Sequence, residues 1–143
     1  MTPPPQRVVR VAERMTRTVV TIRRDTTATT AWALMKVRRL RHLPVVDDRG
    51  RVVGIVSERD LARVPFTPIR AGQPVPVGLP VERIMSAMII SVRPDDDIAE
   101  AAQRMCEHRI GAVPVVDGDR LVGILSAVDL LRELSWSRSR PPP

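Results

Sequence analysis

The sequence has little aromatic character, one cysteine and one lysine. Aromatic residues make up 2% of the 143 residues, with no Tyr, so a flat ligand would be held by aliphatic side chains and not by aromatic stacking. The single cysteine, Cys106, excludes an internal disulfide and cannot form a metal site alone. Lys36 is the only lysine, and nearly all of the positive charge is therefore carried by arginine.

Long apolar segments and catalytic motifs are also missing. No stretch approaches the length of a membrane span, and the N-terminus lacks the apolar run of a signal peptide. We therefore expect a cytoplasmic protein. The sequence contains no Gly-rich phosphate loop, no HExxH and no Ser/His/Asp or Cys/His set. We expect neither enzyme activity, nor a catalytic cofactor, nor a metal site.

The chain does have a sizeable apolar fraction and a strong positive charge. Hydrophobic residues make up 43%, which is enough to form a core. The net charge is +7, and the planar guanidinium fork of arginine suits phosphate and carboxylate groups. This excess favours a polyanionic partner, either a nucleotide or nucleic acid. The arginines are scattered and not clustered, which for most of them favours an arginine-rich composition that serves no ligand.

Two copies of one unit make up most of the chain. Met15–Asp25 resembles Met85–Asp95, 70 positions later, and Leu43–Asp47 resembles Val113–Asp117 at the same offset. After the next turn the second copy is one residue shorter, and a polar turn is where a repeat tolerates a deletion. Val53–Ser57 then matches Val122–Ser126, and both copies close with Ser-x-x-Asp-Leu, at Ser57–Leu61 and Ser126–Leu130.

Each copy predicts the order strand, helix, strand, strand, helix. The runs Thr18–Ile22 and Met88–Val92 favour first strands, and Asp25 and Asp95 can cap the helices that follow. Apolar residues recur at helical spacing at Ala28, Ala31, Trp32, Met35 and Leu40 in copy one, and at Ile98, Ala101, Ala102, Met105 and Ile110 in copy two.

The second half of each copy predicts a hairpin and a further helix. Pro44 and Pro114 end the helical phase and open Pro-Val-Val strands. A polar turn returns the chain in a further strand, at Val52–Val56 and Leu121–Leu125. Ser57 and Ser126 then start second helices.

These elements predict an α+β fold with two domains. The first motif covers residues 8–63 and the second covers residues 81–135. A linker with five prolines and two glycines, residues 64–80, connects them. We expect residues 1–7 and 136–143 to be disordered tails, because they are rich in proline or in arginine and serine.

The combined motifs resemble the cystathionine β-synthase (CBS) motif, present twice over about residues 8–135. The resemblance implies two pseudo-symmetric repeats packed sheet to sheet, with two clefts between them. Each cleft would accept AMP, ADP, ATP or S-adenosylmethionine, and the module would regulate an unknown effector protein. Such pairs often form homodimers through their helices. Candidate residues for that face are Trp32, Met35, Leu40, Met105 and Ile110, and Cys106 belongs either to the core or to the dimer face.

The Ser-x-x-Asp elements have two compatible interpretations. In the family this aspartate binds the ribose hydroxyls, which assigns Asp60 and Asp129 to ribose. Ser57 and Ser126 lie at helix N-termini, where free N–H groups favour a phosphate. A serine followed three residues later by an acid is also a capping box, which needs no ligand to explain it.

Basic residues before the Leu-Pro pair can meet phosphate in similar modules. Arg41 and His42 are therefore expected to serve with Ser126 and Asp129, and Arg59 with Ser57 and Asp60. The counterparts of these basic residues in copy two are Gly111, Ala112 and Val128, which carry no charge. The two clefts should therefore be unequal, although solvated surface charge explains each basic residue as well.

The resemblance also implies an adenine pocket. Its residues come from the first-strand positions and from those around each proline: Thr18, Val19, Val20, Leu43, Pro44, Ala87, Met88, Ile89, Ala112, Val113 and Pro114. Plain core packing is the alternative for each side chain. A nucleic-acid or protein interaction module using Arg132, Arg138 and Arg140 is the alternative function, and a scaffold that has lost its ligand is a third.

Overall fold

The computed structural model describes residues 2–3, 7–64 and 78–139. Most of the linker expected at residues 64–80 and parts of both expected tails lie outside these ranges. The chain divides into two compact units. Unit 1 combines Met1–Val19 with Ile90–Pro143, and unit 2 is Val20–Ile89.

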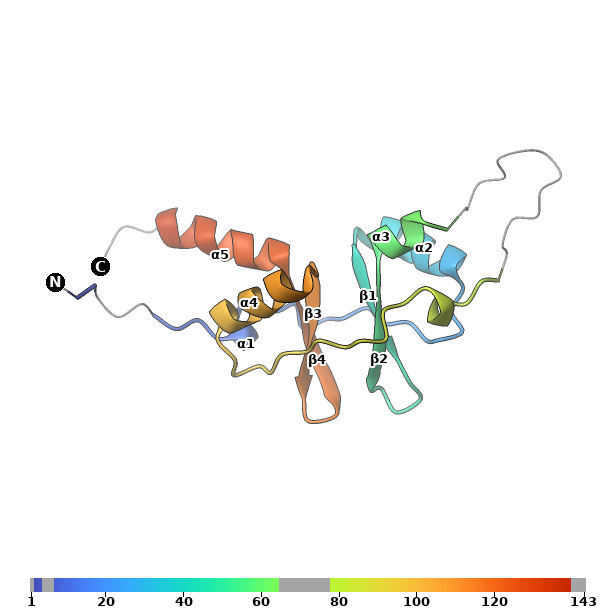
Figure 1. Cartoon of the computed structure of the whole chain (residues 1–143), viewed down its shortest axis with the longest axis horizontal. Helices are drawn as coiled ribbons and strands as arrows, with labels where there is room; N and C mark the ends of the chain where they lie inside the picture. Colours follow the sequence, from blue (N-terminus) through green and yellow to red (C-terminus); the bar gives the residue numbers. More distant parts are fainter. Residues whose placement is uncertain (1, 4–6, 65–77, 140–143) are drawn as a thin grey trace. The chain divides into compact units, whose positions relative to one another are not determined.

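Unit 2 contains the hairpin and the helices of the first repeat (Figure 1). Strands β1 (His42–Val46) and β2 (Val52–Ser57) pair antiparallel, with helices α2 (Ala28–Arg38) and α3 (Glu58–Ala62) and the short 3₁₀ helix η1 (Val81–Arg83). The buried core consists of aliphatic side chains, as the low aromatic content requires, at Ile22, Ala28, Ala31, Met35, Leu43, Val45, Val56, Leu61, Val64 and Val81.

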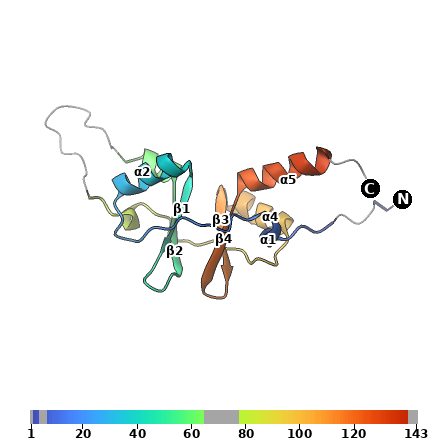
Figure 2. The same ribbon diagram turned by 180° about the vertical axis from the view of Figure 1, so that it is seen from behind.

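Unit 1 repeats this arrangement with the second copy (Figure 2). Its elements are α1 (Val11–Arg14), α4 (Ile98–His108), β3 (Ala112–Asp117), β4 (Arg120–Ser126) and α5 (Ala127–Ser139). Strands β3 and β4 pair antiparallel, with a register shift at Val115/Val116 that matches the shift at Val45/Val46 in unit 2. The α+β class and the duplicated strand-strand-helix ending of each copy are thus confirmed.

The leading segment of each repeat, residues 8–19 in the first and 81–89 in the second, packs in the unit that holds the rest of the other repeat. Val11 is fully buried in the core of unit 1, and Val81 is fully buried in the core of unit 2. Thr16 exchanges two backbone hydrogen bonds with Ile124, at 2.9 and 3.0 Å, and Ser86 exchanges two with Ile55, at 2.9 and 3.1 Å. Each hairpin therefore gains its outer partner from the leading segment of the other repeat.

The expected first strands are reduced to single bridges. Ile22 pairs in parallel with Val45, and Val92 pairs with Val115. Thr18–Ile22 and Met88–Val92 have the β-branched composition of strands, but a strand also needs a partner for its backbone groups. Only the last residue of each run forms a parallel bridge.

The expected helix caps were misplaced by two residues. Thr27 caps α2 by accepting a hydrogen bond from Thr30 N, and Asp97 caps α4 by accepting one from Ala99 N. Asp25 and Asp95 lie in the preceding turns, which close through Thr26 N to Arg23 O and Asp96 N to Arg93 O. Each turn includes the expected aspartate, so the helix begins two residues later than predicted.

Two helix ends also differ from expectation. Leu40 and Ile110 lie beyond α2 and α4, which stop at left-handed Arg39 (φ 55°) and Arg109 (φ 53°). Helix α5 continues to Ser139, so residues 136–139 are helical and not part of a disordered tail. An ion pair between Arg14 and Glu133 joins α5 to α1. Within the described ranges, no helix is long and apolar enough to cross a membrane.

Candidate functional site

The Ser-x-x-Asp element of unit 2 forms a reciprocal helix cap. Ser57 Oγ accepts a hydrogen bond from Asp60 N at 3.0 Å, and Ser57 N donates to Asp60 Oδ2 at 2.8 Å. The residues form a capping box that starts α3 directly after β2. The predicted cap is therefore confirmed, and it holds both side chains in fixed orientations.

Unit 1 repeats this cap with one additional bond. Ser126 N donates to Asp129 Oδ2 at 2.8 Å, Ser126 Oγ lies 2.9 Å from the same oxygen, and Asp129 N donates to Ser126 Oγ at 3.3 Å. The two aspartates are both half-buried. The two copies thus hold an equivalent carboxylate at equivalent places.

Each cap uses only one of the two carboxylate oxygens. Within residues 7–64 and 78–139, no hydrogen bond reaches Oδ1 of Asp60 or Asp129. A carboxylate oxygen accepts strong hydrogen bonds from hydroxyl groups. The cap and a ligand therefore do not compete for the same atom, and the two interpretations of the motif are compatible in this geometry.

Basic side chains surround the Ser57 cap. His42 lies opposite Ser57 across the β1–β2 ladder, and the backbone carbonyl of Arg41 accepts a hydrogen bond from Glu58 N at 2.7 Å. Arg41 Nε also lies 3.9 Å from Glu58 Oε2. Arg59 is the exposed second residue of α3. The structure thus brings Arg41 and His42 to the cap of their own unit. That they bind a phosphate together with Asp129 stays a prediction.

Glu58 contributes to this region, although it occupies an unspecified position of the Ser-x-x-Asp motif and was not predicted as a site residue. Its carboxylate lies between two cations, because Lys36 Nζ also reaches Glu58 Oε1 at 3.2 Å. Lys36 stacks over the Trp32 ring, with its nitrogen 4.3 Å from the centroid. The available sequence signal was the contrast between the repeats, because Ala127 occupies the place of Glu58 in copy two.

His42 is half-buried, and this burial lowers its pKa. Loss of solvent is the largest cause, and the positive charge of Arg41 acts in the same direction. The carboxylates of Asp60 and Glu58 partly oppose this by raising the pKa of His42. The imidazole is therefore mainly neutral at pH 7, and the charged groups around this cap are Lys36, the arginines and the carboxylates.

The residues expected to line an adenine pocket fall into two groups. The side chains of Leu43, Pro44, Ala112, Val113 and Pro114 are buried, and Leu43 and Val113 belong to the unit cores. The first-run residues are more accessible: Thr18, Ala87 and Met88 are exposed, and Val19, Val20 and Ile89 are half-buried. The groups that an adenine base could reach thus lie in the segments that were expected to form the first strands.

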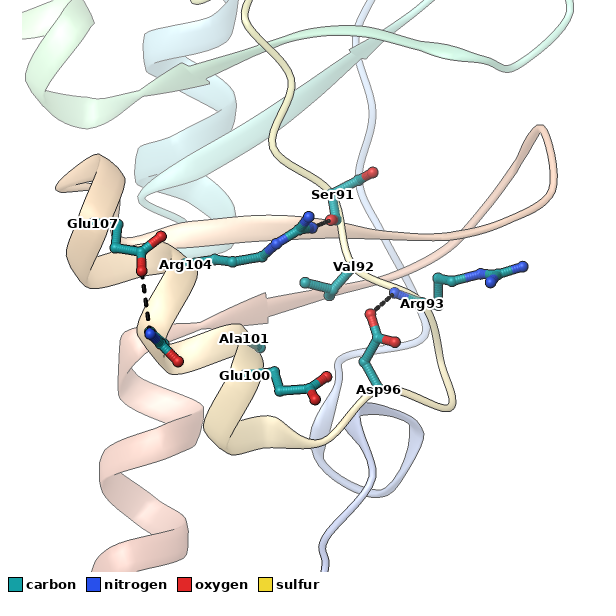
Figure 3. Close-up of a pocket in the computed structure, with 9 residues that line it drawn as sticks. Ser91, Val92, Arg93, Asp96, Glu100, Ala101, Arg104 and Glu107 are labelled. Carbon is teal, nitrogen blue, oxygen red and sulfur yellow. Dashed lines mark hydrogen bonds between the residues drawn. The ribbon is translucent and has the colours of Figure 1, made fainter.

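A shallow cavity of about 620 Å³ lies elsewhere in unit 1, between α4 and the segment before it (Figure 3). Arg104 Nη1 donates to the Ser91 carbonyl at 2.6 Å, and Asp96 accepts a hydrogen bond from Arg93 N at 2.8 Å. Glu100, Arg104 and the other charged residues of α4 follow the spacing of a solvent-facing helix surface. None of the predicted ligand residues lines this cavity.

The remaining expectations concern the dimer face, cysteine and metals. Met35 and Met105 are buried core residues, with 2% and 4% exposure, and so cannot form a dimer face. Cys106 is exposed, which excludes the core position. Among the residues with described positions, no group of three or more His, Cys, Asp or Glu side chains could hold a metal ion.

Comparison with known sequences identifies one family. The profile of the CBS domain matches residues 9–66 and 81–135. An uncharacterized protein of Methanocaldococcus jannaschii is 37% identical over 88% of this chain and 32% of its own length. The CBS domain-containing protein YhcV of Bacillus subtilis is 34% identical over 84% of this chain and 81% of its own length. The chain spans between about a quarter and a third of the length of the first curated relatives that it matches.

Solved structures give the same result. A CBS domain pair in complex with 5′-methylthioadenosine and S-adenosyl-L-methionine superposes with a TM-score of 0.80 and 25% identity, over 92% of this chain and 99% of that chain. CBSX2 in complex with AMP superposes with a TM-score of 0.76 and 26% identity, over 90% of this chain and 98% of that chain.

Proposed function

The chain belongs to the CBS domain family, and from this membership we propose that it is a regulatory module that binds an adenosine ligand and signals to a partner protein. The observation that carries the proposal is the pair of capped aspartates, Asp60 and Asp129. Each keeps Oδ1 outside the cap hydrogen bonds of the described chain. A ribose offers two hydroxyl donors that such a carboxylate can accept.

The similar solved structures support the choice of ligand. One contains 5′-methylthioadenosine and S-adenosyl-L-methionine, and another contains AMP. We propose that Asp60 and Asp129 bind ribose, and that the accessible first-run segments around Thr18–Val20 and Ala87–Ile89 meet the base. Ser57 and Ser126, with Arg41, His42 and Arg59, would contact any phosphate. The ligand acts as a regulator if it binds two conformations of the module with different affinity.

Calorimetry with AMP, ADP, ATP and S-adenosylmethionine tests this proposal. A ligand present at 100 times its dissociation constant should raise the free energy of unfolding by about 2.7 kcal/mol. We expect at least one of the four to bind and to raise the melting temperature. Absence of binding by all four would refute the proposal, and steeply salt-dependent binding of short DNA would instead favour a nucleic-acid module.

The exchange of Asp60 or Asp129 for asparagine should separate the cap from the ligand site. Asparagine keeps an oxygen that can accept the Ser57 or Ser126 N–H, so the free energy of unfolding should fall by less than about 1 kcal/mol. Adenosine affinity should fall about tenfold or more, because a charged acceptor is lost. Calorimetry and thermal unfolding measure the two effects.

Asp47→Asn is the matched control for these variants. Asp47 accepts hydrogen bonds from Arg49 N and Arg51 N in the hairpin turn, at the opposite end of β1–β2 from Ser57. Its exchange should leave ligand affinity unchanged. If Asp60→Asn and Asp129→Asn lose stability but bind adenosine ligands as tightly as the wild type, the aspartates serve only as caps.

We further propose that the module forms a homodimer through α5. Val128, Leu131 and Leu134 are exposed by 43%, 63% and 62%, and together they form an apolar strip on one side of this helix. Leu131→Glu should convert the dimer to a monomer, because it places a charge in the apolar contact. Sedimentation velocity measures this, with exposed Val37→Glu as control. A wild-type chain that stays monomeric at high concentration would contradict the proposal.

A further inference from the structure

The two Ser-x-x-Asp caps are alike in backbone and hydrogen bonds but differ in the charges around them. Next to the cap of unit 2 stand three cations and one further carboxylate: Lys36, Arg41, Arg59 and Glu58. Their counterparts in unit 1 are Cys106, Gly111, Val128 and Ala127, and none of these residues is a lysine, arginine, aspartate or glutamate. Arg63 and Arg132 occupy equivalent places in both copies and do not contribute to the contrast.

The cations of unit 2 are not fully neutralised by their neighbours. Glu58 is shared between Lys36 at 3.2 Å and Arg41 at 3.9 Å. Arg59 forms no hydrogen bond or ion pair with any described residue. The Arg41 side chain is 77% exposed, so its guanidinium remains accessible to a ligand. A phosphate approaching this cap meets donors that can offset the repulsion of Asp60.

The cap of unit 1 presents the opposite situation. Asp129 is a carboxylate with no cation at the positions that correspond to Arg41, His42 and Arg59. Phosphate carries about −1.5 to −2 charges at pH 7. Its approach to a carboxylate that lacks these neighbouring cations is less favourable than its approach to Asp60, whereas a neutral or cationic group meets no such repulsion.

From this contrast we infer that the module sorts adenosine ligands by charge: the cap of unit 2 selects a phosphorylated adenosine, and the cap of unit 1 selects an adenosine compound without phosphate, such as a thioether or sulfonium. The inference rests on the proposed function, adds the ligand class of each cap, and pairs Arg41 with Asp60 of its own unit in place of the pairing with Asp129 that the family resemblance implied. It also assigns Arg41 and Arg59 as the residues that determine specificity. The two repeats then report on two different ligands and not twice on the same one.

Grafting the residues of copy two onto copy one tests the inference. In the full chain, the variant Arg41→Gly/His42→Ala/Arg59→Val should bind AMP at least about tenfold more weakly, because charged hydrogen bonds are lost. Its affinity for adenosine should stay within about twofold of the wild type. Calorimetry measures both ligands, and Arg59→Val alone should show the same direction of change if the triple variant is unstable.

The control is Arg49→Ala/Arg120→Ala, which removes two arginines at the turn ends of the two hairpins, opposite the caps. It has the same loss of net charge and should leave AMP affinity unchanged. The reciprocal graft, Gly111→Arg/Val128→Arg, changes two exposed positions of unit 1. It should weaken S-adenosylmethionine binding about tenfold or more and raise AMP affinity at a second site.

The outcomes separate this inference from the proposed function. Suppose that the wild type binds adenosine and AMP, and that the triple variant either binds both ligands equally more weakly or binds both as tightly as the wild type. Charge sorting is then wrong, and the proposal of adenosine binding stands. Charge sorting is also wrong if the control lowers AMP affinity as much as the triple variant does. If the wild type binds none of adenosine, AMP and S-adenosylmethionine, both proposals fail.

Discussion

Exchanging Val11 for aspartate is expected to unfold the unit that contains the hairpin of the second repeat, although Val11 belongs to the first repeat in the sequence. Val11 is fully buried, in one cluster with Val92, Val113 and Leu125. An unpaired charge buried there should cost several kcal/mol. The loss should appear first in β3 and β4, because their core loses Val11.

Backbone contacts add to the effect of Val11 on unit 1. Val11 N donates to Asp96 O at 2.8 Å, and Ile98 N donates to Val9 O at 3.0 Å. These bonds join the leading segment to the start of α4. A charge that expels Val11 therefore also removes hydrogen bonds at the beginning of that helix.

Native-state hydrogen exchange distinguishes the two hairpins. In Val11→Asp, amides of Val113–Leu125 should lose protection before those of Leu43–Val56. Val81→Asp is the matched reciprocal, because Val81 is equally buried in the other core, and it should reverse the order. Equal loss of protection in both hairpins for both variants would show that the leading segments do not belong to separate units.

The repeat itself could be predicted from the sequence, but the exchange of leading segments could not. Met15 and Met85 occupy equivalent places, as do Val11 and Val81, so either leading segment has the composition to fill either core. The sequence pattern is the same for packing within a repeat and between repeats. Only the tertiary contacts, such as those of Thr16 with Ile124, distinguish the two.

The local elements show the same limit on a smaller scale. The caps at Ser57 and Ser126 could be predicted because serine and aspartate stand at capping-box spacing right after a strand. The prediction that Asp25 and Asp95 cap the helices was wrong, because several polar residues precede each helix and any of them can cap it. The choice of Thr27 and Asp97 depends on how the preceding turn closes. The charge around the Asp60 cap followed from sequence differences between the repeats, but the sharing of Glu58 required the structure.

A second large loss of stability is expected from adding a side chain at the glycine where each leading segment crosses a hairpin. Gly123 lies under Met15, and a Cβ added at Gly123 would stand 2.6 Å from Met15 Sδ and 3.0 Å from Thr16 O. Gly54 faces Met85 and Ser86 in the same way, at 2.5 and 3.0 Å. The glycine in each Val-Gly-Ile strand therefore serves close approach of another segment.

Gly123→Ala should destabilise the protein by about 1–3 kcal/mol, and Gly123→Val by more. The Met15 side chain can move, but Thr16 O is fixed because it accepts a hydrogen bond from Ile124 N at 3.0 Å. The added methyl must therefore displace the leading segment or bend β4. Chemical denaturation measures the free energy of unfolding of each variant.

Two further variants identify the cause of this loss. Gly118→Ala is the control: its φ of +62° strains an alanine, but no atom lies within 4 Å of the added Cβ, so the cost should stay near 1 kcal/mol. Adding Met15→Ala to Gly123→Ala should recover little stability if the backbone oxygen of Thr16 sets the limit, since Met15 itself is buried and its truncation opens a cavity. A Gly123→Ala protein as stable as the wild type would contradict the close approach, and with it the role of Thr16 in joining the leading segment to the hairpin of the second repeat.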